Sequence, residues 1–150
     1  MTPVEYNDTI IKEQAKIIEL MFDLVAKIET DLDGCEAVRL KTIVQCDSSI
    51  LLVSKMEPFD SDVSMKNTAL DLFNFYKKAY QKEYKEMIEI LQLGDKITAE
   101  DMARMTNLNE ELAKKETSLD AAFKGAQAAF AKKHNITIEE NKLQKKIDNN

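Results

Sequence analysis

The sequence predicts an all-α protein, an antiparallel up-down four-helix bundle with long helices. The chain has only three glycines and two prolines in 150 residues. Gly34, Pro58 and Gly94 fall where a helical apolar pattern stops. Between them, apolar residues recur at spacings of three and four, which is the period of a helix with one buried face. Because short connections make consecutive helices antiparallel, we expect residues 1–135 to form one bundle.

The first helix is expected to run from about Pro3 to Thr30, with Thr2 as its cap. Its apolar stripe consists of Ile10, Ile11, Ile17, Ile18, Met21, Leu24, Val25 and Ile28. After a turn that ends at Gly34, the second helix is expected to continue to 56–57, since Pro58 disfavours helical geometry in the residue before it. The apolar set of this helix is Val38, Leu40, Ile43, Val44, Ile50, Leu51, Val53 and Met56.

The third helix is expected to begin at Asp60-Ser61-Asp62, whose side-chain oxygens can accept hydrogen bonds from free amides, and to end at Gly94. Its predicted core face is Ala69, Leu70, Phe73, Tyr76, Ala79 or Tyr80, Tyr84, Met87, Ile88 and Leu91. Thr98 and Asp101 resemble a capping box, which opens a fourth helix that reaches about Lys133. Its stripe is Met102, Met105, Leu108, Leu112, Leu119, Ala122, Phe123, Ala126 and Phe130.

Residues 136–150 have weak apolar periodicity. We expect this C-terminal tail to be partly ordered near Ile136 and Ile138 and disordered towards Asn150.

The charge of the chain disfavours a nucleic-acid partner, and its hydropathy disfavours a membrane-spanning segment. The formal net charge is -6 and the sequence pI is about 4.9, so a phosphate backbone would be repelled and nucleic acid is not an expected partner. No apolar run approaches the roughly 20 residues that a transmembrane helix needs. The sequence therefore predicts a protein without a transmembrane segment.

Cys35 and Cys46 are the two cysteines of the chain. If both lie on the second helix, a rise of about 1.5 Å per residue places their α-carbons roughly 16 Å apart, too far for a disulfide. We expect two small buried side chains; a reactive thiol or an intermolecular bridge is the alternative.

Polar residues within the apolar stripes are candidates for a ligand or partner surface. Gln14 occupies a position where the heptad pattern places an apolar residue, so it either fixes helix register, with Ser48 or a tyrosine hydroxyl, or contacts a ligand. Tyr76, Tyr80 and Tyr84 recur every four residues among lysines. Tyrosines at this spacing are typical of a core boundary with the hydroxyl in water, and the alternative is a strip that holds an anionic or stacked ligand.

Gly125 lies in an alanine-rich stretch of the fourth helix, which indicates close approach of a neighbouring helix or, alternatively, a narrow groove for a partner helix. The sole histidine, His134, is expected to cap the end of that helix. The sequence has no Glu-x-x-His pairs, haem attachment motif, phosphate-binding loop or complete calcium loop. We therefore expect a non-enzymatic protein with no catalytic, cofactor-binding or metal-ligating residues.

Three segments of the chain resemble a family of uncharacterised bacterial surface proteins. They are residues 6–14 (YNDTIIKEQ), residues 69–76 (ALDLFNFY) followed by Glu83-Tyr84, and residues 128–135 (AAFAKKHN). The family occurs in leptospires and in Bacteroidetes, often behind lipoprotein or export leaders. The resemblance implies an extracytoplasmic helical bundle, in the periplasm or at the cell surface, and implies no activity.

Two functions follow as expectations. The first is a non-enzymatic helical-bundle module of the bacterial cell envelope that binds a protein or a small ligand through its surface. The second is a cytoplasmic inhibitor or immunity-type protein whose acidic bundle masks a basic partner. The partner is unidentified in both cases, and we expect a monomer or a weak dimer.

Overall fold

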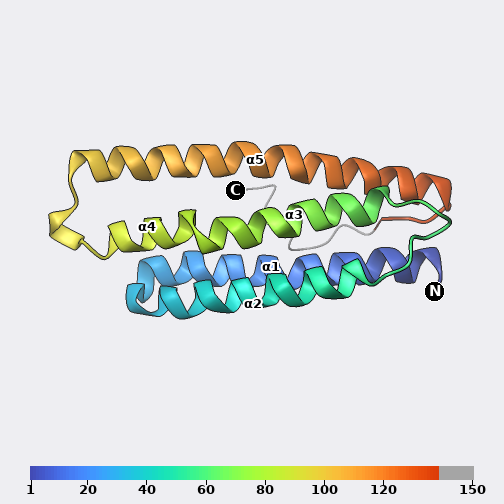
Figure 1. The fold of residues 1–150 in the computed structure, drawn as a ribbon, viewed down its shortest axis with the longest axis horizontal. Coiled ribbons are helices and arrows are strands. Elements are labelled where there is room, and N and C mark those ends of the chain that lie inside the picture. Colours follow the sequence, from blue (N-terminus) through green and yellow to red (C-terminus); the bar gives the residue numbers. More distant parts are fainter. Residues whose placement is uncertain (139–150) are drawn as a thin grey trace.

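The computed structural model describes residues 1–138 and consists of helices joined by short turns (Figure 1). In chain order the elements are α1 (Pro3–Thr30), the 3-10 helix η1 (Leu32–Gly34), α2 (Cys35–Ser54), α3 (Ser64–Gln81), α4 (Glu83–Leu91), the 3-10 helix η2 (Gly94–Lys96) and α5 (Ala99–Lys133). Because α4 continues the direction of α3, the two together form the third long helix. The predicted all-α four-helix bundle is confirmed.

The helices α3 and α4 lie between α5 and the α1–α2 hairpin (Figure 1). α3 packs against both α2 and α5, whereas α1 packs mainly against α2. α1 and α5 meet near the N-terminus, where the ring of Tyr6 stacks on Phe130 and the amide of Gln127 donates a hydrogen bond of 2.9 Å to Asn7. At the opposite end the turn from α4 to α5 extends beyond the α1–α2 hairpin.

Two helix starts follow the predicted capping chemistry. The hydroxyl of Thr2 accepts from the backbone N–H of Glu5, whose carboxylate accepts in return from the N–H of Thr2. Thr98 and Asp101 form the same reciprocal pair at the start of α5. Each pair satisfies amides that the first turn of a helix leaves without a partner, so both boundaries are set locally.

The connection between α2 and α3 is longer than predicted. α2 ends at Ser54 rather than at 56–57, and α3 begins at Ser64. The predicted start at residue 60 is wrong because Asp60 and Ser61 have φ values of 51° and 63°, which a right-handed helix does not allow. Asp62 does act at the helix start, since its carboxylate accepts from the N–H of Ser64 at 2.9 Å.

The third helix is interrupted at Lys82, which has φ -119° and ψ -72°. The regular helix stops at Gln81 and restarts at Glu83. The sequence did not predict this break, because neither glycine nor proline lies near it.

The apolar core divides along the length of the molecule. Near the N-terminus one cluster joins α1, α2, α3 and α5, and its buried members are Tyr6, Ile10, Ile17, Cys46, Val53, Met65, Ala69, Leu72, Phe73, Tyr76, Phe123 and Phe130. Farther along, a second cluster links α3 and α4 to the α1–α2 hairpin through Leu24, Cys35, Val38, Tyr80 and Ile88. A third cluster links α3 and α4 to α5 through Ala79, Met87, Leu108 and Leu112.

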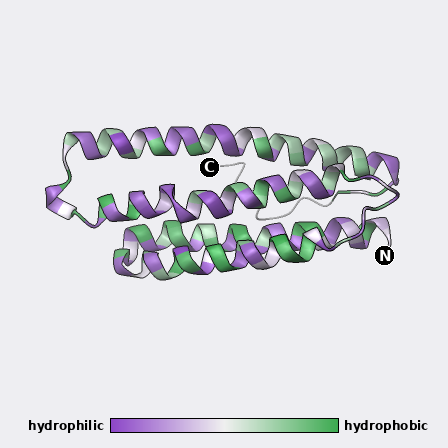
Figure 2. Cartoon of the chain, in the orientation of Figure 1, coloured by the Kyte–Doolittle hydropathy of each residue, from purple (hydrophilic) through white to green (hydrophobic). Residues whose placement is uncertain are grey.

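The helix α2 buries a different face from the one its apolar residues predict. Leu40, Val44 and Leu51 are 50%, 64% and 55% exposed, and apolar residues recur along this helix (Figure 2). Its buried residues are mostly small or polar, namely Cys35, Val38, Arg39, Thr42, Cys46, Ser49 and Val53.

After α5, Ile136 packs against the first core cluster, while Ile138 is 37% exposed. The rest of the predicted tail, residues 139–150, lies outside the described residues. Among the helices of residues 1–138, none combines the length and the apolar character that a bilayer span requires.

Candidate ligand-binding site

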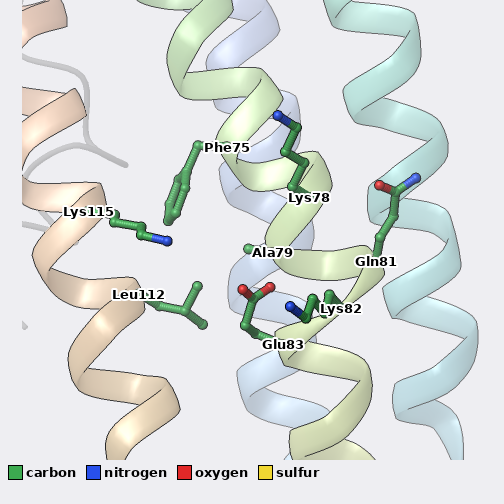
Figure 3. A pocket seen from close by; sticks show the side chains of 8 residues that line it. All are labelled: Phe75, Lys78, Ala79, Gln81, Lys82, Glu83, Leu112 and Lys115. Carbon is green, nitrogen blue, oxygen red and sulfur yellow. The ribbon is translucent and has the colours of Figure 1, made fainter.

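A pocket of about 380 Å³ lies where the break in the third helix faces α5 (Figure 3). Its lining residues come from both sides of the break and from one turn of α5, and they are Phe75, Lys78, Ala79, Gln81, Lys82, Glu83, Leu112 and Lys115. This volume falls within the range of roughly 300–1,000 Å³ that is usual for small-molecule sites.

The floor of the pocket is apolar. Phe75 and Ala79 come from α3, and Leu112 comes from α5; all three belong to the third core cluster or pack against it. Figure 3 shows the side chains of Phe75 and Leu112 directed into the space between the two helices. Because the side chain of Ala79 is a single methyl group, it leaves space between α3 and α5 at this level.

The rim of the pocket is basic. Lys78, Lys82 and Lys115 are exposed, and among residues 1–138 none of them forms an ion pair. The neighbouring Lys77 differs, since its ammonium lies 2.6 Å from the carboxylate of Asp47 on α2. The pocket thus gathers three lysines without an ion-pair partner in the described residues and one carboxylate, that of Glu83, in a chain whose formal net charge is -6.

A buried arginine holds the break that borders the pocket. Arg39 is 5% exposed, and its Nη1 donates a hydrogen bond of 2.9 Å to the backbone carbonyl of Tyr80. Its Nε and Nη2 donate to the two carboxylate oxygens of Glu36 at 2.8 Å and 2.5 Å. Since Tyr80 lies in the last turn of α3, its carbonyl is one of the groups that a helix end leaves without an intrahelical partner.

The three tyrosines proposed as a ligand strip do not line this pocket. Tyr76 and Tyr80 are 3% and 1% exposed, so the prediction of boundary residues with hydroxyls in water is wrong for both. The hydroxyl of Tyr76 donates to Glu116 on α5 at 3.2 Å, and the ring of Tyr80 stacks on that of Tyr84 with centroids 4.2 Å apart. Burial raises the pKa of all three hydroxyls, that of Tyr84 to about 12. They are neutral groups that join helices.

Glu116 is the acidic member of this tyrosine group. Burial raises the pKa of its carboxyl above the ordinary value, the hydrogen bond from Tyr76 opposes that shift, and the nearby charge of Asp120 adds to it. Nothing in the sequence pattern singles out Glu116, because it lies among exposed polar residues of α5.

Gln14 faces the core as predicted, with 3% of its surface exposed. Ser48, the suggested partner, is exposed, so that pairing is wrong. The polar link between α1 and α2 uses adjacent residues instead. Ser49 donates to the buried carboxylate of Glu13 at 2.8 Å and accepts from the amide of Gln45 at 3.0 Å. These hydrogen bonds link α1 to α2 within the core.

Gly125 is exposed, and a β-carbon added there would meet no atom within 4 Å. The predicted close approach of a neighbouring helix is therefore wrong. Ala122, predicted as a core residue, is exposed as well. His134 stands at the C-cap of α5, where its backbone N–H bonds to Phe130, and its ring packs against Phe59 and Phe130.

Cys35 and Cys46 are both free and buried, as expected for small apolar side chains. Burial raises the pKa of the Cys46 thiol to about 12. Within residues 1–138, no three His, Cys, Asp or Glu side chains are grouped so that they could share a metal ion.

Comparisons of the chain with protein-family models, curated proteins and solved structures gave no match. The fold defines the class as an all-α protein with four packed helices.

Proposed function

We propose that the protein is a non-catalytic helical-bundle module that binds a small amphiphilic anion in the pocket between the α3–α4 break and α5. The observation that carries the proposal is the combination of an apolar floor with three lysines that have no ion-pair partner among residues 1–138. A ligand with a short hydrocarbon body and a carboxylate or phosphate head matches both features.

The two parts of the site supply different contributions. Burying apolar ligand surface against Phe75 and Leu112 yields roughly 25 cal/mol per Å². The lysine stems extend along apolar surface and keep their ammonium groups in water, so they attract the anionic head without being buried themselves. Because those charges are exposed, their attraction falls as salt concentration rises.

We also propose a cellular setting for this module. A place in the bacterial cell envelope is supported by the sequence resemblance of residues 6–14, 69–76 and 128–135 to bacterial surface proteins. In that setting the module would capture its ligand as a monomer or a weak dimer.

Calorimetric titration with decanoate tests the proposed binding. We expect saturable binding of one decanoate per chain, weaker at high salt, and no binding of decylamine, which has the same hydrocarbon body with a positive head. Replacing Lys115 by alanine should weaken binding by about 1 kcal/mol, or roughly fivefold, as is usual for an exposed charge pair. Lys114→Ala is the matched control, because Lys114 carries the same charge on the same helix but does not line the pocket.

Equal loss of affinity in Lys114→Ala and Lys115→Ala would contradict the proposed site. Absence of any decanoate binding would contradict it as well. The alternative function is a cytoplasmic inhibitor that masks a basic partner. The net charge of -6 is the observation that supports that alternative.

A further inference from the structure

We infer that Arg39 is a positioning residue for the pocket, because its hydrogen bond to the Tyr80 carbonyl sets the break that brings the lining residues together. This inference rests on the proposed function, since it explains how that binding site is built. Arg39 itself does not line the pocket.

The break lies within the lining of the pocket. Five residues within the stretch 78–83 line it, and the helix stops at Gln81 and restarts at Glu83. In Figure 3 the side chain of Glu83 lies on the side of the helix that faces Leu112, whereas that of Gln81 lies beside α2. The residues that border the pocket therefore come from both sides of the interruption.

Local sequence does not account for the break. The residues around it are Ala79, Tyr80, Gln81, Lys82 and Glu83, and most of these are good helix formers. Sharp helix kinks arise at proline, at glycine or serine pairs, at helical bulges, or where a side chain inserts into the backbone hydrogen-bond ladder. Here a side chain from another helix bonds to a carbonyl at the break, which matches the last of these causes.

Arg39 is well suited to this role because its position is fixed from both sides. Glu36 binds two of its nitrogens, and the same guanidinium reaches across to Tyr80. Burying a guanidinium costs free energy unless its N–H groups have acceptors. Because the Arg39 guanidinium cannot bond to water instead, its hydrogen bond to the Tyr80 carbonyl is strongly favoured. The α1–α2 hairpin thereby shapes a pocket on the opposite side of α3.

The test compares Arg39→Met, which keeps side-chain bulk without donors, with Arg39→Lys, whose ammonium can still reach the carbonyl. Two quantities are measured: decanoate affinity, and hydrogen exchange of the backbone amides of residues 83–85. In Arg39→Met we expect the helix to become continuous, so these amides exchange more slowly and decanoate affinity falls at least fivefold. Arg39→Lys should restore both towards wild type.

Ser49→Ala is the matched control, because it also removes a buried polar contact between α2 and a neighbouring helix, away from the break. It should leave decanoate affinity and amide exchange of 83–85 unchanged. Should Arg39→Met fail to fold, Arg39→Gln, which is too short to bond both Glu36 and Tyr80, answers the same question.

A folded Arg39 variant with unchanged exchange at 83–85 and unchanged affinity would overturn the inference. Equal losses in Arg39→Met and Arg39→Lys would do so too. If wild-type protein binds no decanoate, the proposed function fails, yet the exchange of amides 83–85 still decides whether Arg39 sets the break.

Discussion

The guanidinium of Arg39 on α2 donates a hydrogen bond of 2.9 Å to the backbone carbonyl of Tyr80, 41 residues farther along the chain. This contact joins the α1–α2 hairpin to the third helix at the point where that helix is interrupted. The candidate binding site therefore depends on a residue outside its lining.

Arg39→Met should lower the free energy of unfolding by about 1.5–3 kcal/mol, the usual contribution of a hydrogen bond to a charged group. The reason is that the Tyr80 carbonyl loses its donor while Glu36 loses its cation. Urea unfolding followed by circular dichroism measures the change. An unchanged midpoint would mean that the carbonyl is satisfied equally well without Arg39.

Glu116→Gln should stabilise the protein more at neutral pH than in acid. Burial raises the folded-state pKa of Glu116 above the ordinary value of 4.5, so folding favours the protonated form. Its contribution to stability is complete below that ordinary pKa and is lost as pH rises through the raised pKa. Glutamine stays neutral throughout and can still accept from the Tyr76 hydroxyl.

Unfolding free energies measured between about pH 4 and pH 8 test this difference. Glu110→Gln, an exposed position on the same helix, is the control. A gain from Glu116→Gln that does not depend on pH would contradict the assignment.

Gly125→Ala should raise the free energy of unfolding by about 0.5–1 kcal/mol. Glycine weakens a helix interior, and the added methyl group would enter open space. Thermal unfolding measures the effect. A loss of stability would show that the surface beside residue 125 is occupied, which would revive the interpretation of a groove for a partner helix.

The thiols of Cys35 and Cys46 should resist a thiol-specific reagent such as Ellman's reagent in the native protein and react fully in urea. Both are completely buried, and the pKa of Cys46 is raised to about 12, so no thiolate is presented to the reagent. Rapid reaction of either thiol under native conditions would contradict this packing.

The sequence predicted the helix starts whose hydrogen-bonding partners lie close together in the chain. The start of α1 at Thr2 and the start of α5 at Thr98 follow from capping boxes, in which all partners lie within three residues. The sequence did not predict a feature whose contacting residues are far apart in the chain. The break at Lys82 adjoins the contact between Arg39 of α2 and the Tyr80 carbonyl, and neither glycine nor proline lies near it.

The candidate site was predicted only in part. Lys78 and Lys82 lie among the tyrosines of the strip for which an anionic ligand was the alternative interpretation, but those tyrosines do not line the pocket, and only the fold brings Lys115 of α5 to it. One signal was available for the core polar group, because Glu13 falls at a helical spacing between Ile10 and Ile17, as its neighbour Gln14 does.

A methyl NMR titration of the wild-type protein with decanoate tests the proposed binding site most sharply. We predict that the methyl resonances of Ala79 and Leu112 shift and saturate together, whereas those of Leu40 and Leu51, on the exposed face of α2, stay unchanged. Equal shifts at Leu40 and Leu51 would show nonspecific adsorption to apolar surface. That result, or no shift at Ala79 and Leu112, would contradict a binding site between the α3–α4 break and α5.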